Sequence, residues 1–209
     1  MKQDWRVIFS GGLQFLCAGL FSVLACGLSA YDAVQPLGIE SCVEILQESL
    51  LVLSTICFTV TAVRMPQYAG GIFLLAGLTF AFFVREMDAC LDLVAHGFWK
   101  YVLVICFPIY LFFLRKFGWR TIIPGIAHYI RSRSFTMFLP GIVTILVYSR
   151  LFGCKYLWEL YLPPHVGIKQ VKCFRSLSEE SMELLGYAII FAASLIAAHA
   201  ARRREQTES

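Results

Sequence analysis

Charged side chains are scarce in this sequence, and their scarcity excludes most kinds of water-soluble protein. Only 15% of the 209 residues are charged, whereas 58% are hydrophobic. A typical globular domain has about 25% charged residues. The net charge of +4 comes from basic residues scattered along the chain, which form no basic stripe suited to nucleic acid. The composition therefore predicts a polytopic membrane protein that contacts membrane lipid and binds no nucleic acid.

Motifs of redox and zinc enzymes are also missing. The eight cysteines include no CxxC pair, and Cys17, Cys26, Cys57 and Cys106 lie inside apolar runs, where a thiol behaves as a small hydrophobe. The four histidines form neither HExxH nor HxxxH. These absences disfavour a thiol-redox enzyme and leave any metal site without a known histidine motif.

Long apolar runs are what this sequence has in abundance. A helix needs about 20 residues to cross the hydrocarbon core of a bilayer. Six runs approach that length, and they are residues 7–31, 44–63, 67–85, 95–114, 135–152 and 181–201. Because lipid cannot satisfy backbone polar groups, each run is predicted to be a helix. The predicted fold is all-α, a single domain over residues 1–209 formed by a bundle of six transmembrane helices.

The charges also predict how this bundle is oriented. With the N-terminus inside, eleven of the eighteen basic residues lie at the inner ends of the runs, and eleven of the fourteen acidic residues lie at the outer ends. The excess of basic residues inside predicts that both termini are cytoplasmic. In a bacterium this would be the inner membrane. The acidic bias needs a separate cause, because the positive-inside tendency says little about acids.

Two segments between the runs are long enough to have structure of their own. Residues 119–134 carry isoleucines at four-residue spacing with arginines around them, which predicts a short interfacial helix on the cytoplasmic surface. Residues 153–180 form an outer loop that could cover a site. This loop contains Cys154 and Cys173, and the sequence leaves a disulfide between them open because spacing alone cannot establish one.

The turn between the third and fourth predicted helices is unusually charged. Asp88 and Asp92 follow the third helix, whereas His96 and Lys100 begin the fourth. Acids at a helix C-terminus and bases at an N-terminus both oppose the helix dipole. We therefore expect these charges to pair with one another or to bind a ligand.

A metal centre is one interpretation of this charged outer end. Its predicted ligands have oxygen or nitrogen donors, and they are Glu48, Glu86, Asp88, Asp92 and His96. Such a mixed set suits a divalent metal, and it does not select among Zn, Mn, Fe, Mg and Ca. A metal-bound water would be the nucleophile, with Glu183 as general base. Arg85 or Lys100 would stabilise the developing negative charge.

A salt-bridge network is the alternative interpretation of the same residues. Arg85 and Lys100 would then neutralise Glu48, Glu86 and Glu183 and would hold the helices together. Ionisable residues inside a membrane are nonetheless candidates for function by default.

Three functions from different classes fit these patterns. The first is a metal-assisted hydrolase or transferase that acts on a lipid or lipid-linked substrate at the outer leaflet. The second is an accessory subunit whose acidic outer face docks a membrane-protein partner. The third is an ion- or proton-coupled carrier that uses Glu48, Glu86 and Glu183, although the sequence has no clear pair of matching halves.

Overall fold

The computed structural model describes residues 16, 20, 23–31, 41–162 and 167–208, and these residues form helices and turns without any strand. Five helical segments are long and apolar enough to cross a membrane, namely Cys42–Arg64, Pro66–Glu86, Phe98–Lys116, Arg133–Phe152 and Ile168–Gln206. The chain is thus an all-α, multi-pass helical membrane protein. Most of the first predicted helix, residues 7–31, lies outside the described residues, although residues 23–31 are helical.

The helices begin and end where the local sequence favours it. Helix α2 (Cys42–Arg64) starts with a capping box, in which the Ser41 hydroxyl accepts from the Glu44 amide at 3.1 Å and the Glu44 carboxylate accepts from the Ser41 amide at 2.7 Å. It ends before Pro66, because the residue that precedes a proline is disfavoured in a helix. The other elements are η1 (Pro66–Tyr68), α3 (Ala69–Glu86), α4 (Asp88–Leu91), α5 (Phe98–Gly118), η2 (Trp119–Thr121), α6 (Ile122–Ile130), α7 (Arg133–Val143), the π-helix η3 (Thr144–Ser149), α8 (Arg150–Phe152), α9 (Lys155–Tyr161) and α10 (Ile168–Glu208).

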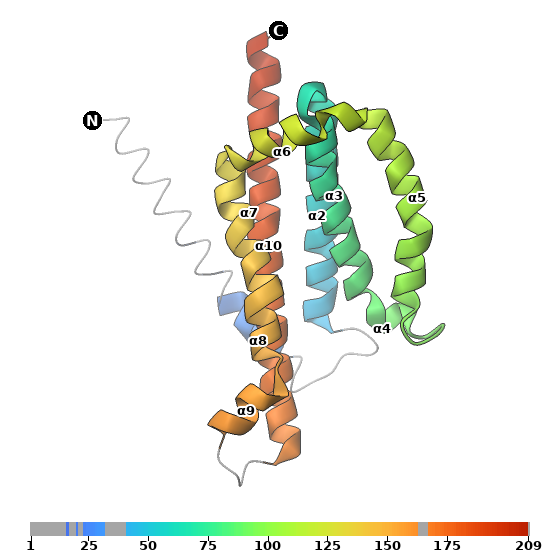
Figure 1. Cartoon of the computed structure of the whole chain (residues 1–209). Coiled ribbons are helices and arrows are strands. Elements are labelled where there is room, and N and C mark those ends of the chain that lie inside the picture. Colours follow the sequence, from blue (N-terminus) through green and yellow to red (C-terminus); the bar gives the residue numbers. More distant parts are fainter. Residues whose placement is uncertain (1–15, 17–19, 21–22, 32–40, 163–166, 209) are drawn as a thin grey trace, which may run out of the picture.

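The long helices α2, α3, α7 and α10 form the packed centre of the molecule (Figure 1). Helix α5 stands to one side and packs mainly on α3. The core holds Leu51, Phe58, Tyr187 and Ile190, each completely buried. Burial of these side chains between α2 and α10 fixes the relative position of the two helices that carry the acidic residues discussed below.

The two ends of the bundle differ in charge. One end, which we call the basic end, contains α6, the turn between α2 and α3, and the C-terminus (Figure 1). The described basic residues at this end are Arg64, Arg115, Lys116, Arg120, Arg131, Arg133, Arg202, Arg203 and Arg204. The opposite end, which we call the acidic end, contains α4 and α9. Its described acids are Glu44, Glu48, Glu86, Asp88, Asp92, Glu159, Glu179, Glu180 and Glu183.

The last helix is longer than the sequence predicts. Helix α10 begins at Ile168, whereas the predicted span covers residues 181–201. The predicted outer loop, residues 153–180, therefore contains two helical pieces, α9 and the first turns of α10. Hydropathy marks only the part of a helix that lies in lipid, and the polar residues 168–180 continue the same helix beyond it. At the basic end, α6 lies within the predicted interfacial segment 119–134.

Candidate functional site

Charged side chains from three helices meet at the acidic end of the bundle. Arg85 and Glu86 come from the last turn of α3, and Ser149 and Arg150 come from the junction of η3 and α8. Helix α10 supplies the remaining members, which are Glu179, Glu183 and Tyr187. We call these seven residues the charged cluster. Since residues at four-residue spacing lie on one face of a helix, all three members from α10 face the same side.

Glu183 is the centre of the charged cluster. Its Oε1 atom accepts from the Ser149 hydroxyl at 2.8 Å and from Arg150 Nη2 at 2.5 Å. Arg85 Nη2 lies 3.5 Å from the same oxygen. The Glu183 side chain is only 7% exposed, so its charge is stabilised by these donors and not by water.

Glu86 forms the second buried centre. Its Oε1 atom lies 2.7 Å from Arg85 Nη1 and accepts from the Tyr187 hydroxyl at 2.6 Å. Arg85 therefore bridges two carboxylates, one from its own helix and Glu183 from α10. This bridge ties α3 to α10 directly at the acidic end.

The arginines are much more exposed than the carboxylates that hold them. The exposed fraction is 48% for the Arg150 side chain and 34% for Arg85, against 8% for Glu86. Arg150 Nη1 also contacts Glu179 at 3.1 Å. Each guanidinium has five N–H donors, and the contacts with Glu86, Glu179 and Glu183 use only two of them on each arginine. The arginines consequently present further donors toward the surface.

A local irregularity of the backbone positions Ser149 and Arg150. The chain between α7 and α8 forms a π-helix over residues 144–149. Such wide turns are rare and shift the side chains that follow them around the helix axis. Here the shift comes immediately before Arg150, which points to Glu179 and Glu183 on α10.

The charged turn after α3 has a different structure from the cluster. Asp92 Oδ1 accepts from the Gly97 amide at 2.7 Å, and Asp92 Oδ2 lies 2.9 Å from His96 Nδ1. Gly97 precedes α5 and has φ of 77°, a left-handed conformation that glycine adopts without strain. Asp92 thus lies beside the N-terminus of α5, where the helix dipole favours an acid. Asp92 is also the C-cap residue of the four-residue helix α4, so its carboxylate lies at the end of one helix and beside the start of the next. The sequence prediction considered only the first of these two positions.

The predicted metal ligands are divided between these two places. Glu86 belongs to the charged cluster, whereas Asp92 and His96 pair on the turn, where the His96 side chain is exposed. Asp88 is exposed at the start of α4, and Glu48 is half-buried in α2. Among the described residues, no group of three or more His, Cys, Asp or Glu side chains is arranged to hold a metal ion.

The predicted catalytic residues are brought together only in part. Glu183 and Arg85 are neighbours in the charged cluster. Lys100 is exposed, and its Nζ atom lies 5.5 Å from the centre of the Trp99 ring. Arg150, and not Lys100, is the second basic residue that pairs with Glu183.

Sequence reasoning missed four members of the cluster. One is Glu179, which lies one helical turn before Glu183 on α10. Arg150 was detectable, because it is an arginine inside the predicted span 135–152. Tyr187 was detectable as the residue four positions after Glu183, on the same helix face. Ser149 gave no signal, since a hydroxyl in a membrane helix usually bonds its own backbone.

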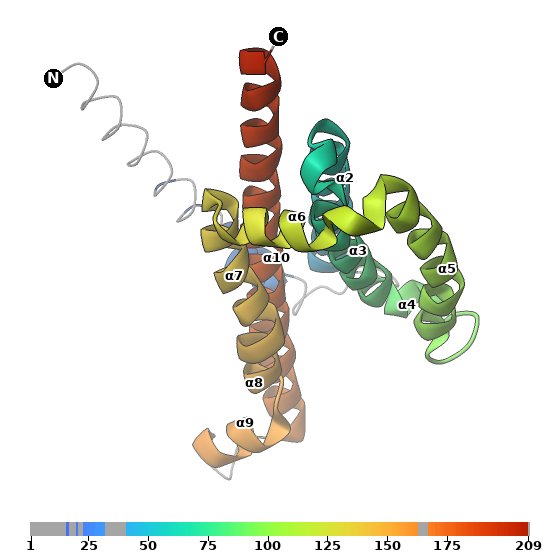
Figure 2. The ribbon, with the colours of Figure 1, turned by 45° about the horizontal axis from the view of Figure 1, so that its top comes forward.

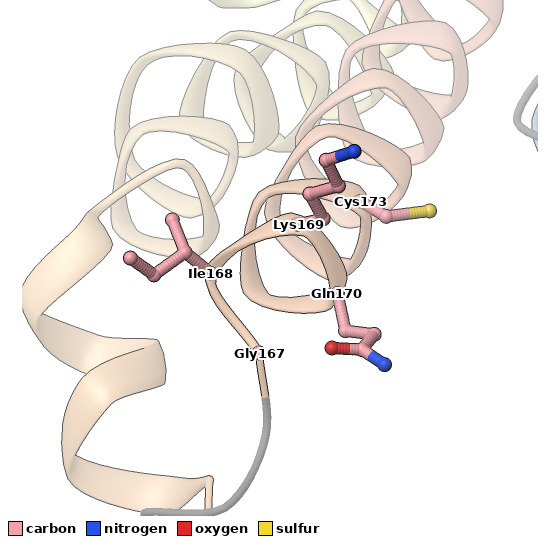
Figure 3. A pocket seen from close by; sticks show the side chains of 5 residues that line it. All are labelled: Gly167, Ile168, Lys169, Gln170 and Cys173. Carbon is pink, nitrogen blue, oxygen red and sulfur yellow. The ribbon is translucent and has the colours of Figure 1, made fainter.

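A separate pocket of about 740 Å³ lies at the start of α10. It is lined by Gly167, Ile168, Lys169, Gln170 and Cys173. Figure 3 shows that these side chains point in different directions and do not converge on one position. No predicted site residue lines this pocket. Cys173 and Cys154, the candidates for a disulfide, are both free and exposed.

Substitution of Asp92 tests the structure of the turn. The Gly97 amide is the largest cause that lowers the pKa of Asp92, and the hydrogen bond with His96 adds to it. A lowered pKa means that Asp92 stabilises the turn above about pH 4, the ordinary value for Asp, and that this support is lost as the pH falls through the lowered value. We expect Asp92→Asn to accelerate hydrogen exchange of the Gly97 amide severalfold at neutral pH. In Asp88→Asn, the exposed control, this exchange should stay unchanged; equal acceleration in both variants would contradict the proposed role.

No protein-family model, no curated protein and no solved structure matches this chain.

Proposed function

We propose that this membrane protein binds a lipid or lipid-linked substrate at the outer leaflet, with a phosphate of its headgroup against Arg85 and Arg150. One observation carries the proposal. Two arginines are held in place by buried carboxylates. Both arginine side chains are partly exposed, and each has N–H groups that the carboxylates do not use. A planar guanidinium with two adjacent free N–H groups is well suited to a phosphate.

The positive charge of the cluster is carried by its more exposed side chains. Glu86, Glu179 and Glu183 face Arg85 and Arg150. Arg175 also acts electrostatically on Glu179, and Asp88 acts on Arg85. Three positive charges therefore face four negative ones, so an anionic ligand would be favoured only at the exposed guanidinium groups, of which that of Arg150 is the more exposed.

The position of the cluster favours a ligand that comes from the membrane. Helix α9 follows Arg150 closely in the chain and carries Tyr156 and Tyr161, both exposed. Exposed aromatic side chains are typical of the membrane–water interface. Arg150 would thus lie at headgroup depth, where a lipid reaches it by lateral diffusion.

An enzymatic reaction is the further step of this proposal. A hydrolase or transferase would hold the phosphate of its substrate on the arginines, which would stabilise negative charge in the transition state. Glu183 is contacted by Ser149, Arg150 and Arg85, which suits a residue that orients the arginines better than a general base. The divalent metal stays a prediction, and elemental analysis of the purified protein tests it.

An accessory subunit is the second candidate, and the exposure of α5 favours it. Val104, Ile105, Phe107 and Phe112 on this helix are all exposed, and the helix packs mainly on α3. These side chains would contact either lipid or the helices of a membrane-protein partner. Affinity purification of the detergent-solubilised protein, with and without Phe107→Ala and Phe112→Ala, distinguishes lipid from a membrane-protein partner. A partner bound through α5 would co-purify with the unmodified protein and be lost from the variant.

Binding of a lipid phosphate tests the main proposal. We expect Arg150→Gln to weaken binding of phosphatidic acid by about tenfold to a hundredfold, because a hydrogen bond to a charged group contributes about 1.5–3 kcal/mol. Native mass spectrometry of the detergent-solubilised protein measures the bound fraction, with diacylglycerol of the same chains as the ligand that lacks phosphate. Lys155→Gln is the matched control, since Lys155 is at the same end and pairs with the exposed Glu159.

Two results would contradict the proposal. One is equal binding of phosphatidic acid and diacylglycerol by the unmodified protein. The other is an equal loss of binding in Arg150→Gln and Lys155→Gln. Turnover of a bound lipid ester by the unmodified protein, lost in Arg150→Gln, would support the enzymatic form of the proposal.

A further inference from the structure

A second lipid-contacting surface lies at the other end of the molecule. Helix α6 runs across the bundle, transverse to α10, in both views (Figures 1 and 2). It connects α5 to α7 and therefore lies at the level where the membrane-spanning helices end. A helix in this position is parallel to the membrane surface.

One face of α6 is fixed against α3 by close backbone contact. A Cβ atom added to Gly125 would lie 2.4 Å from the Tyr68 carbonyl oxygen and 2.8 Å from the Gly71 Cα. Tyr129, one turn later on the same face, is buried and its ring packs against Phe58 and Phe138. The hydroxyl of Ser134 bonds to the Tyr129 hydroxyl at 2.9 Å and further secures this face. The orientation of α6 about its own axis is thus determined.

A different face of α6 leaves three isoleucines uncovered. The exposed fraction is 80% for Ile123, 40% for Ile126 and 52% for Ile130. The spacing of three and four residues between them places all three on one side of the helix. Trp119, which precedes α6, is also exposed. An apolar face on a helix parallel to the membrane is well suited to insertion among lipid acyl chains.

Basic residues surround this apolar face. Arg120 precedes α6 and Arg131 follows it, and both are exposed. Arg115, Lys116 and Arg133 are exposed on the adjoining helix ends. The acids that the described helices carry at the basic end are Glu205, which lies 3.7 Å from Arg64, and Glu208. The surface around α6 is therefore strongly positive.

We infer that α6 and its flanking basic residues form a docking surface for anionic phospholipids of the leaflet at the basic end. The isoleucines contact the acyl chains, and Arg120 and Arg131 contact the headgroups. Charge complementarity selects anionic lipids over zwitterionic ones. This surface is independent of the charged cluster, which lies at the opposite end.

Fluorescence quenching by brominated lipids tests the inference. The protein keeps Trp119 as its single tryptophan, with Trp5, Trp99 and Trp158 replaced by Phe, and is placed in nanodiscs that contain brominated phosphatidylglycerol or brominated phosphatidylcholine. We expect stronger quenching by phosphatidylglycerol, and we expect Arg120→Gln with Arg131→Gln to reduce this preference at least about fivefold. Lys169→Gln with Lys172→Gln, at the acidic end, is the control and should preserve it.

Each outcome decides the inference. Equal quenching by the two lipids, or a preference that survives the substitutions at Arg120 and Arg131, would overturn it. A second measurement needs no substitution in α6, because the preference of the single-tryptophan protein should weaken as salt is raised from about 0.01 M to 1 M. A salt-independent preference would overturn the electrostatic explanation. Both lipids have a phosphate, so a failure here does not affect the proposal for Arg150.

Discussion

Replacement of Glu183 by Gln is expected to destabilise the protein by roughly 3 kcal/mol, the lower end of the range for breaking a buried ion pair. The substitution keeps the shape of the side chain and removes its charge. Arg85 and Arg150, which both contact Oε1 of Glu183, then meet a neutral amide oxygen in place of their common anionic partner. We use the lower end of the range because both arginines remain partly exposed, so water compensates for part of the loss. Unfolding by sodium dodecyl sulfate in mixed micelles, followed by circular dichroism, measures the change.

Glu159→Gln is the matched control for this experiment. Glu159 is also at the acidic end and pairs with Lys155 at 3.0 Å, but both side chains are exposed. An exposed ion pair contributes about 1 kcal/mol or less. An equal effect of the two substitutions would contradict the view that Glu183 is the centre of the network.

A double-mutant cycle shows how much of the effect belongs to Arg150. The substitutions Glu183→Gln and Arg150→Gln are combined, and the coupling is obtained from the deviation from additivity. We expect the double variant to be more stable than the sum of the two single effects predicts, because the Arg150–Glu183 pair is then removed as a whole and neither of these two charges remains without the other. Such coupling would locate the interaction between α8 and α10 in this ion pair.

The structural role of the network supports the binding role that we propose for it. Arg85 and Arg150 each contact two carboxylates, which hold the guanidinium planes in a fixed position. A fixed donor loses little conformational entropy when it binds a ligand. The buried carboxylates would therefore serve phosphate recognition by limiting the motion of the arginines, even though they do not contact the phosphate.

The fold was largely predictable because its main signal is hydropathy. Each of the four predicted spans that begin between residues 44 and 135 corresponds to a membrane-spanning helix of the structure. The beginning of α10 was not predictable in this way, since its first turns are polar and hydropathy does not register them. The short helix α6 lies within the segment that the sequence predicts to be interfacial, and it runs transverse to α10.

The candidate site was less predictable, because it depends on which helix faces another. Sequence spacing placed Glu183 and Arg85 near the same membrane depth, and the structure brings them together. Lys100 has a similar depth, but α5 stands on the side of α3 away from the cluster, so it does not reach Glu183. Arg150 directly follows the π-helix, which changes the register of the chain, and from there it reaches Glu183.

A single methyl group at Gly71 is expected to have an effect of similar size, through packing and not through charge. Gly71 lies where α3 meets α6, and a Cβ atom added there would be 2.4 Å from the Ile126 amide nitrogen and 2.5 Å from the Gly125 carbonyl carbon. These are backbone atoms, so no side chain can rotate away and the two helices must separate. Overpacking of this kind lowers the free energy of unfolding by about 1–3 kcal/mol or somewhat more. The better helix propensity of alanine offsets less than about 1 kcal/mol of this loss.

The control is Gly27→Ala, which makes the same chemical change in the helical residues 23–31. Beyond the neighbouring backbone of its own helix, no heavy atom of the described residues lies within 4 Å of a Cβ added at Gly27. Its effect should be neutral or stabilising by up to about 1 kcal/mol, whereas Gly71→Ala should destabilise by roughly 2 kcal/mol in the same detergent unfolding experiment. Because Gly71 is in backbone contact with α6, Gly71→Ala should also reduce the preferential quenching of Trp119 fluorescence by brominated phosphatidylglycerol. Equal effects of the two alanines on stability would mean that α3 and α6 are not in backbone contact, and the fixed orientation of α6 would lose its basis.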